Sequence, residues 1–147
     1  MKYYEDFAVG STFDSRDTYK ISAEEIKGFA QKWDPWPYHL DDEQARTTLI
    51  GRLFAPSVLT FCVSVKLAHT TEYYQISSVA GLGIDKLQMR KPVFAGDELT
   101  VRLTVVEKRE SKSKPNMGVM VKRIEVFCQD GDVVLSYLLS GLVNKRP

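Results

Sequence analysis

Residues 58–68 read VLTFCVSVKLA, and this apolar segment indicates the architecture of the chain. Its one charged residue is Lys66, and as a helix it is apolar on nearly every side. Because proline is favoured at the start of a helix, we expect this helix to run from about Pro56 to about His69. A helix of this composition is expected to be buried on most of its sides. Its β-branched residues leave a strand as the alternative.

Four later segments have the pattern of β-strands. They are residues 82–89, 99–105, 119–128 and 133–143. The second alternates strictly between apolar and polar residues, and the last two are joined by Gln129–Asp132, where Asp-Gly favours a hairpin. Gly96-Asp97 is a turn signal, and the polar segment Lys108–Asn116 is predicted to be a mobile loop. An apolar helix followed by antiparallel strands predicts the α+β class, with a long antiparallel sheet wrapped around a central helix.

Two other helices are expected before the apolar one. Ser22 and Glu25 have the spacing of a capping box, and apolar residues follow them at helical spacing. This helix must end near Asp34, because Pro35 excludes the residue before it from the α region. Asp41 is expected to cap a short second helix.

Composition limits the class of protein. The 147 residues suffice for one domain, residues 1–147, with a single core. The 20 Lys and Arg nearly balance the 19 Asp and Glu, so neither nucleic acid nor an anionic membrane is indicated as a partner. No apolar run approaches the roughly 20 residues of a membrane span, and no signal peptide is recognisable. We expect a cytoplasmic protein, with Cys62 and Cys128 as buried thiols or, alternatively, as one disulfide.

The segment Trp33–Asp41, WDPWPYHLD, carries the residues that suggest chemistry. Pro35 and Pro37 stiffen it and hold a carboxylate, Asp34, five residues before an imidazole, His39. A rigid pair of this kind suits acid–base catalysis, which requires preorganised groups. By spacing alone, however, the segment favours a structural turn between helices, with Asp34 as a cap and His39 exposed.

Several ordered segments resemble the MaoC-like dehydratases, also called (R)-specific enoyl-CoA hydratases, which have the hotdog fold. The family signature Asp-x-x-Pro-x-His is matched by residues 34–39. The other similar segments are Ile50–Ala55, Lys91–Val93, Gly96-Asp97, Ser111–Pro115 and Val126–Leu135. The resemblance extends over most of the chain. It implies hydration of a trans-2-enoyl-CoA to a 3-hydroxyacyl-CoA, or the reverse dehydration.

The resemblance also implies catalytic roles. Asp34 would hold and activate water as the general base, and His39 would orient the water and shuttle the second proton. The backbone amide of Ser57, at the start of the central helix, would stabilise negative charge on the thioester oxygen. The family usually has glycine at this position, so the serine side chain occupies space that glycine leaves for the substrate.

Four further residues are candidates for substrate binding. Trp36 stands where the family has asparagine or glutamine, and with Tyr38 it would lie beside the site. Arg90 and Lys91 would meet the phosphates of coenzyme A. Packing for the two aromatic residues and a solvated strand end for the two cations are the alternatives.

The resemblance implies an acyl-CoA substrate, a role in fatty acid metabolism and a homodimer or dimer of dimers. No cofactor is implied, since coenzyme A is part of the substrate, and no metal-ligand spacing is present. A hotdog thioesterase is an alternative, but such enzymes commonly need a carboxylate on or near the central helix, and residues 58–68 contain none. A non-catalytic acyl-CoA-binding protein is the other alternative, because Trp36 and Ser57 depart from the family pattern.

Overall fold

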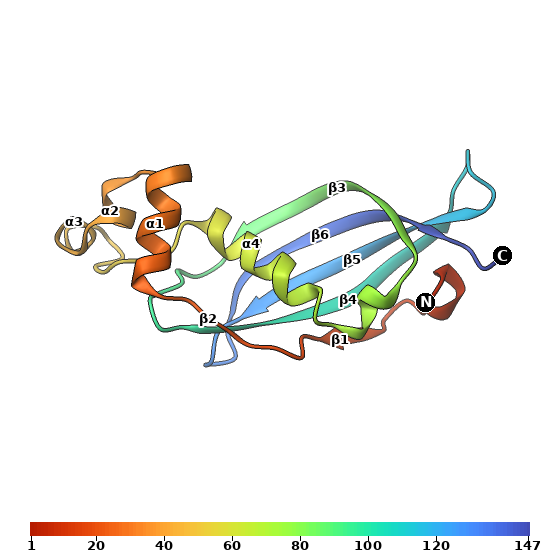
Figure 1. The fold of residues 1–147 in the computed structure, drawn as a ribbon, viewed down its shortest axis with the longest axis horizontal. Coiled ribbons are helices and arrows are strands. Elements are labelled where there is room, and N and C mark those ends of the chain that lie inside the picture. The colour runs from red at the N-terminus through yellow and green to blue at the C-terminus, as the bar shows by residue number, and fades with distance from the viewer.

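The computed structural model describes residues 1–147 and has a six-stranded antiparallel sheet with one long helix packed across it (Figure 1). The strands are β1 (Thr12–Asp14), β2 (Tyr19–Lys20), β3 (Ser78–Met89), β4 (Glu98–Glu110), β5 (Met117–Phe127) and β6 (Val133–Asn144). They lie in the order β1-β4-β5-β6-β3, and β2 also pairs with β4. The predicted α+β class is therefore confirmed, and β3 forms one edge of the sheet.

The helices are grouped by position along the sheet. They are η1 (Tyr4–Asp6), α1 (Ala23–Trp33), α2 (Pro37–Leu40), α3 (Asp42–Arg46), α4 (Ser57–Ala68) and η2 (Glu72–Gln75). The central helix α4 crosses the sheet, α1 to α3 gather beyond one end, and both termini lie at the other end (Figure 1). None of these helices is long and apolar enough to cross a membrane.

Residues 58–68 form most of helix α4, so the strand alternative for this segment is wrong. One face of α4, with Leu59, Val63 and Leu67, is buried against the sheet. The opposite face is exposed in the single chain, where Val58 and Val65 are 55% and 37% accessible. The expectation that α4 is buried on most sides is therefore wrong for one chain. Cys62 lies on the exposed face as a free thiol, and Cys128 is free and half-buried.

Local sequence signals account for most helix boundaries. Ser22 accepts a hydrogen bond from the Glu25 amide at 3.1 Å, as predicted. The Glu25 carboxylate does not complete the capping box, because it accepts from the Tyr19 hydroxyl instead. Helix α1 ends at its C-cap Asp34, and Asp41 caps α3. Both predicted boundaries are confirmed.

Two strands are longer than predicted. β4 continues to Glu110, so only residues 111–116 form the loop expected at Lys108–Asn116. The polar end of β4 is held by pairing with β5 and by an ion pair of 2.8 Å between Glu110 and Lys145. β3 begins at Ser78, four residues before the predicted start. The predicted turn at Gly96-Asp97 is confirmed, and Gly96 has a φ of +91° that favours glycine.

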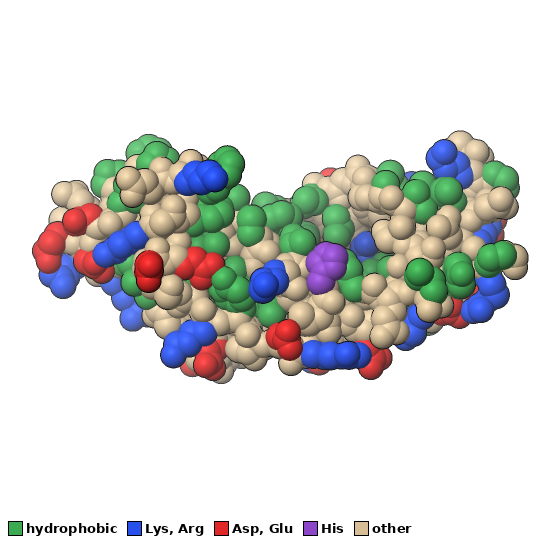
Figure 2. All heavy atoms as spheres, viewed as in Figure 1, with side chains coloured by type: hydrophobic (Ala, Val, Ile, Leu, Met, Phe, Trp, Pro, Cys, Tyr) green, Lys and Arg blue, Asp and Glu red, His purple; other side chains and the backbone are tan.

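The edge strand β3 is exposed over its whole length. All of its 12 residues are solvent-accessible, and it is hydrogen-bonded on one side only, to β6. Its exposed apolar side chains are Val79, Leu82, Ile84, Leu87 and Met89. Figure 2 shows hydrophobic side chains in a concave stretch between the two raised ends of the molecule. An unpaired strand edge and an apolar surface are thus both open in the single chain.

Candidate active site

Asp34 and His39 lie together beyond the end of the sheet. Asp34 is the C-cap of α1, where its amide donates to the Ala30 carbonyl at 2.8 Å. Pro37 is the first residue of the one-turn helix α2, which carries His39. The imidazole Nε2 lies 3.6 Å from a carboxylate oxygen of Asp34. His39 is only 4% exposed, so the exposed histidine of the structural alternative is wrong, whereas the capping by Asp34 in a turn between helices is confirmed.

The hydrogen bonding of His39 determines which ring nitrogen faces Asp34. Nδ1 lies 2.8 Å from the backbone carbonyl oxygen of Phe54. A carbonyl only accepts, so Nδ1 must carry the proton, and in the neutral ring Nε2 has the free lone pair. The 3.6 Å between Nε2 and the Asp34 oxygen is too long for a direct hydrogen bond. A water molecule bridging the two atoms suits this gap.

An aromatic stack fixes the imidazole from the side. Tyr38 lies parallel to Trp36 and to Phe54, with ring centroids 5.8 and 5.4 Å apart. His39 meets the rings of Tyr38 and Phe54 edge-on, each at 4.7 Å. Trp36 and Trp33 are 57% and 65% exposed, so in the single chain the two tryptophans do not exclude water from the pair.

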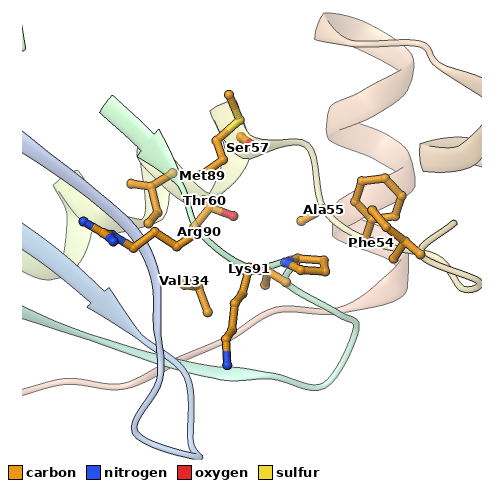
Figure 3. A pocket seen from close by; sticks show the side chains of 12 residues that line it. Phe54, Ala55, Ser57, Thr60, Met89, Arg90, Lys91 and Val134 are labelled. Carbon is orange, nitrogen blue, oxygen red and sulfur yellow. The ribbon is translucent and has the colours of Figure 1, made fainter. Parts of the chain in front are cut away.

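A cavity of about 260 Å³ opens at the N-terminus of α4, and we call it the Ser57 cavity (Figure 3). Its walls come from α4, the end of β3 and its following loop, the start of β6 and the segment before α4. The lining side chains labelled in Figure 3 are Phe54, Ala55, Ser57, Thr60, Met89, Arg90, Lys91 and Val134. Asp34, His39, Trp36 and Tyr38 do not line it. Phe54 connects the Ser57 cavity with the Asp34–His39 pair. Its ring borders the cavity, and its carbonyl oxygen is hydrogen-bonded to His39.

Free backbone amides face this end of α4. The amides of Leu59 and Thr60 both donate to the Pro56 carbonyl, at 3.0 and 3.3 Å. The amides of Ser57 and Val58 have no acceptor within the chain. Unpaired amides and the positive end of the helix dipole favour an anion here. The position of Ser57 is therefore suited to the oxyanion role predicted for it.

Thr60 is a further residue of the site, and it belongs to no sequence motif. Its side chain is 2% exposed, its hydroxyl has no hydrogen-bond partner in the chain, and it points into the Ser57 cavity (Figure 3). Helical spacing could have found it, because residues three apart share one helix face and Thr60 follows Ser57 by three. The Phe54 carbonyl had no such signal, since a backbone group leaves no trace in the sequence.

The two predicted cations both line the Ser57 cavity. Arg90 Nε donates to the Ser136 hydroxyl at 2.9 Å and has no carboxylate partner. Lys91 donates to Asp132 at 2.7 Å, which raises the pKa of the lysine. Arg90 is thus the freer of the two cations. No cluster of three His, Cys, Asp or Glu side chains that could hold a metal ion is present.

Comparison with known proteins relates this geometry to a family. Residues 6–126 match the family model described as MaoC like domain. The crystal structure of a MaoC-like dehydratase from Rhodospirillum rubrum superposes with a TM-score of 0.93 at 35% identity, covering 100% of this chain and 99% of that one. A mesaconyl-CoA hydratase from Cereibacter sphaeroides is 26% identical over 99% of this chain, which spans 42% of that protein.

The fold has a further relative of about twice the length. A conserved hypothetical protein from Mycobacterium tuberculosis with a double hotdog fold superposes with a TM-score of 0.80 at 20% identity, over 99% of this chain and 45% of that one. The sheet and central helix are therefore a hotdog fold, as expected. Because its family model spans most of the sequence, this chain belongs to the MaoC-like domain family.

Proposed function

We propose that this protein is a hydratase that adds water to a trans-2-enoyl-CoA thioester, and that Asp34 and His39 activate the water. One observation carries the proposal. The Phe54 carbonyl fixes the proton of buried His39 on Nδ1, so that Nε2 can accept from a water shared with Asp34 across 3.6 Å. Relatives named as dehydratase and hydratase support the reaction class.

The reaction follows from this arrangement. The bridging water donates one hydrogen bond to the Asp34 carboxylate and the other to His39 Nε2. Asp34 accepts a proton as the water oxygen bonds to the β-carbon, and the electron pair of the double bond moves toward the thioester carbonyl. The enolate then takes one proton at the α-carbon from the Asp34–His39 pair, which returns the pair to its starting state.

The start of α4 stabilises the negative charge that develops on the thioester oxygen. The free amide of Ser57 donates to this oxygen, and the helix dipole adds to the stabilisation. Arg90 and Lys91, at the mouth of the same cavity, attract the phosphates of coenzyme A, Arg90 more strongly because Lys91 is already paired with Asp132. Trp36 and Tyr38 support the pair from the side, with Tyr38 in contact with His39.

The assay is the loss of enoyl absorbance of crotonyl-CoA. Asp34→Asn and His39→Ala are each expected to lower kcat by about 10²- to 10⁴-fold, the range for a lost general base. Glu24→Gln is the matched control, because Glu24 is an exposed carboxylate of α1 without an ion-pair partner. Thiol release without hydration would show a thioesterase instead. No turnover by the wild type at any acyl chain length would refute the proposal.

The oxyanion role of Ser57 can be tested by deleting its amide alone. Ser57 is the first residue of α4, where proline is well accepted, and Pro56 already has the extended ψ of 137° that a residue before proline needs. Ser57→Pro is therefore expected to keep the helix and lower kcat by about 10²-fold. Ser57→Ala removes only the hydroxyl, so the difference between the two variants measures the amide. Equal kcat values would exclude the amide as the donor.

We further propose that two copies pair through β3 to form a homodimer. The open edge of β3 and the exposed face of α4 are both unpartnered in the single chain, and pairing two β3 edges antiparallel covers the open edge of each copy. The double hotdog relative, of which this chain spans 45%, supports such a pair. Ile84→Lys places a charge near the centre of β3 and is expected to give monomers in sedimentation. Val9→Lys, at an exposed residue elsewhere, is the control; monomeric wild type would refute the pairing.

A further inference from the structure

A second cavity contains a buried lysine without a counter-ion. It measures about 380 Å³, and we call it the Lys122 cavity. Lys122 comes from β5 and is only 7% exposed. Its ammonium forms no ion pair and no hydrogen bond within the chain, and lies 5.2 Å from the centre of the Tyr73 ring. A buried charge of this kind is costly to keep unless a ligand pairs with it.

The surroundings of Lys122 favour an anion. The other titratable groups that line the cavity are His69 after α4 and Tyr73 and Tyr74 of η2, and no carboxylate is among them. The Tyr73 hydroxyl is buried and has no hydrogen-bond partner. Gly141 makes room for the ammonium, since a Cβ there would lie 3.2 Å from Lys122 Nζ. The cavity thus holds one cation without an acceptor, whereas the Tyr73 hydroxyl is closed off from the cavity.

The Lys122 cavity and the Ser57 cavity lie toward opposite ends of β3. Ser78 and Ala80 line the first, whereas Met89, at the other end of the strand, lines the second. When two β3 strands pair antiparallel over their full length, Ser78 of one copy lies opposite Met89 of the other. Each Ser57 cavity is then next to the Lys122 cavity of the second copy. In such a pair, the acyl group of a thioester bound at the Ser57 cavity of one copy can reach toward Lys122 of the other.

We propose that the Lys122 cavity binds a carboxylate at the far end of the acyl group, so that the preferred substrates are enoyl-CoA thioesters of dicarboxylic acids. This inference rests on the proposed hydratase function and on pairing through β3. The carboxylate accepts from the Lys122 ammonium, which has no acceptor within the chain. A methyl group at the same place leaves the ammonium unpaired, so the cavity favours an acyl group that ends in a carboxylate over one that ends in a methyl group. A free small carboxylate is the other source of the same chemistry.

Matched thioesters test the inference by kinetics. The substrates are trans-2-enoyl-CoA thioesters of four to ten carbons, each compared with the thioester of equal length whose terminal methyl is a carboxylate. For each chain length, kcat/KM of the carboxylate-ended thioester is divided by kcat/KM of the methyl-ended one. At the acyl chain length that reaches Lys122, this ratio is expected to be about 10- to 100-fold lower in Lys122→Met than in the wild type. Lys112→Met, which removes an exposed charge from the loop at residues 111–116, is the control.

A ratio that Lys122→Met leaves unchanged at every length would overturn the inference. Absence of hydration of any thioester by the wild type would instead refute the proposed function, and direct binding then tests the cavity alone. Calorimetry with succinate, glutarate and adipate is expected to show binding to the wild type and none to Lys122→Met. Lys122 could bind free dicarboxylates while the ratio of kcat/KM for the thioesters stays unchanged in Lys122→Met. This result would show that the site binds a free carboxylate, and it would overturn the proposal that the carboxylate belongs to the acyl group. No binding and no change in ratio would overturn the site itself.

Discussion

Lys122→Met is expected to make the protein more stable at pH 7, although it removes a charged residue. Burial lowers the pKa of Lys122 to about 8, from 10.5 for an ordinary lysine. At about 1.36 kcal/mol per pKa unit, the buried charge lowers the free energy of unfolding by about 3 kcal/mol. Methionine is similar in shape to the lysine stem and carries no charge. Loss of the contact between the ammonium and the Tyr73 ring destabilises the variant by about 1 kcal/mol. The free energy of unfolding of Lys122→Met is therefore expected to be about 2 kcal/mol higher than that of the wild type.

The gain has a characteristic dependence on pH. Below pH 8, Lys122 is protonated in both the folded and the unfolded chain, so the cost of the buried charge is fully present. Between pH 8 and 10.5 the folded chain gives up this proton first, and the stability of the wild type rises relative to the variant. Above 10.5 the lysine is neutral in both states, and the difference due to charge is gone.

Thermal denaturation at one fixed protein concentration, at pH 7 and pH 10.5, measures this difference. At pH 7 the melting temperature of Lys122→Met is expected to be higher by roughly 4–8 °C. Lys112→Met, at an exposed lysine, is expected to match the wild type at both pH values. If the variant is less stable than the wild type at pH 7, or equally stabilised at both pH values, burial of the Lys122 charge does not destabilise the protein.

Three other substitutions test packing and capping by urea denaturation. Tyr73→Phe removes a buried hydroxyl without a partner and is expected to raise the free energy of unfolding by about 1 kcal/mol; a decrease would reveal an acceptor. Gly118→Ala places a methyl against the Tyr4 ring and is expected to cost about 1–3 kcal/mol while leaving crotonyl-CoA kinetics unchanged, because the site lies at the other end of the sheet. Ser22→Ala removes the cap of α1 and is expected to cost about 1 kcal/mol; an unchanged midpoint would mean that water replaces the cap.

The parts of the site that could be predicted from sequence are those that local chemistry determines. Asp34 and His39 come together because two prolines bend a short segment, and both signals lie within nine residues of sequence. The place of Ser57 follows from the position of Pro56 and the helix dipole. The Trp36 and Tyr38 positions depend instead on how Phe54 packs against them, which is tertiary information.

Lys122 shows why other features could not be predicted. Val119, Met120 and Val121 before it are all apolar, so period-two alternation does not decide which face of β5 is buried. Only the packing of η2 against the sheet places Lys122 inside. β3 starts before the expected Leu82 because pairing of residues 78–81 with β6 overrides the low strand propensity of Gly81.

The hydrogen bond from His39 to the Phe54 carbonyl makes the tautomer of His39 independent of the shape of the Ser57 cavity. Its acceptor is a backbone carbonyl, so mutation of residue 54 to another side chain leaves it in place. The ring of the same residue borders the Ser57 cavity and helps to set its shape. The acyl group that the protein accepts can therefore drift through changes at position 54, while the tautomer of His39 is inherited unchanged.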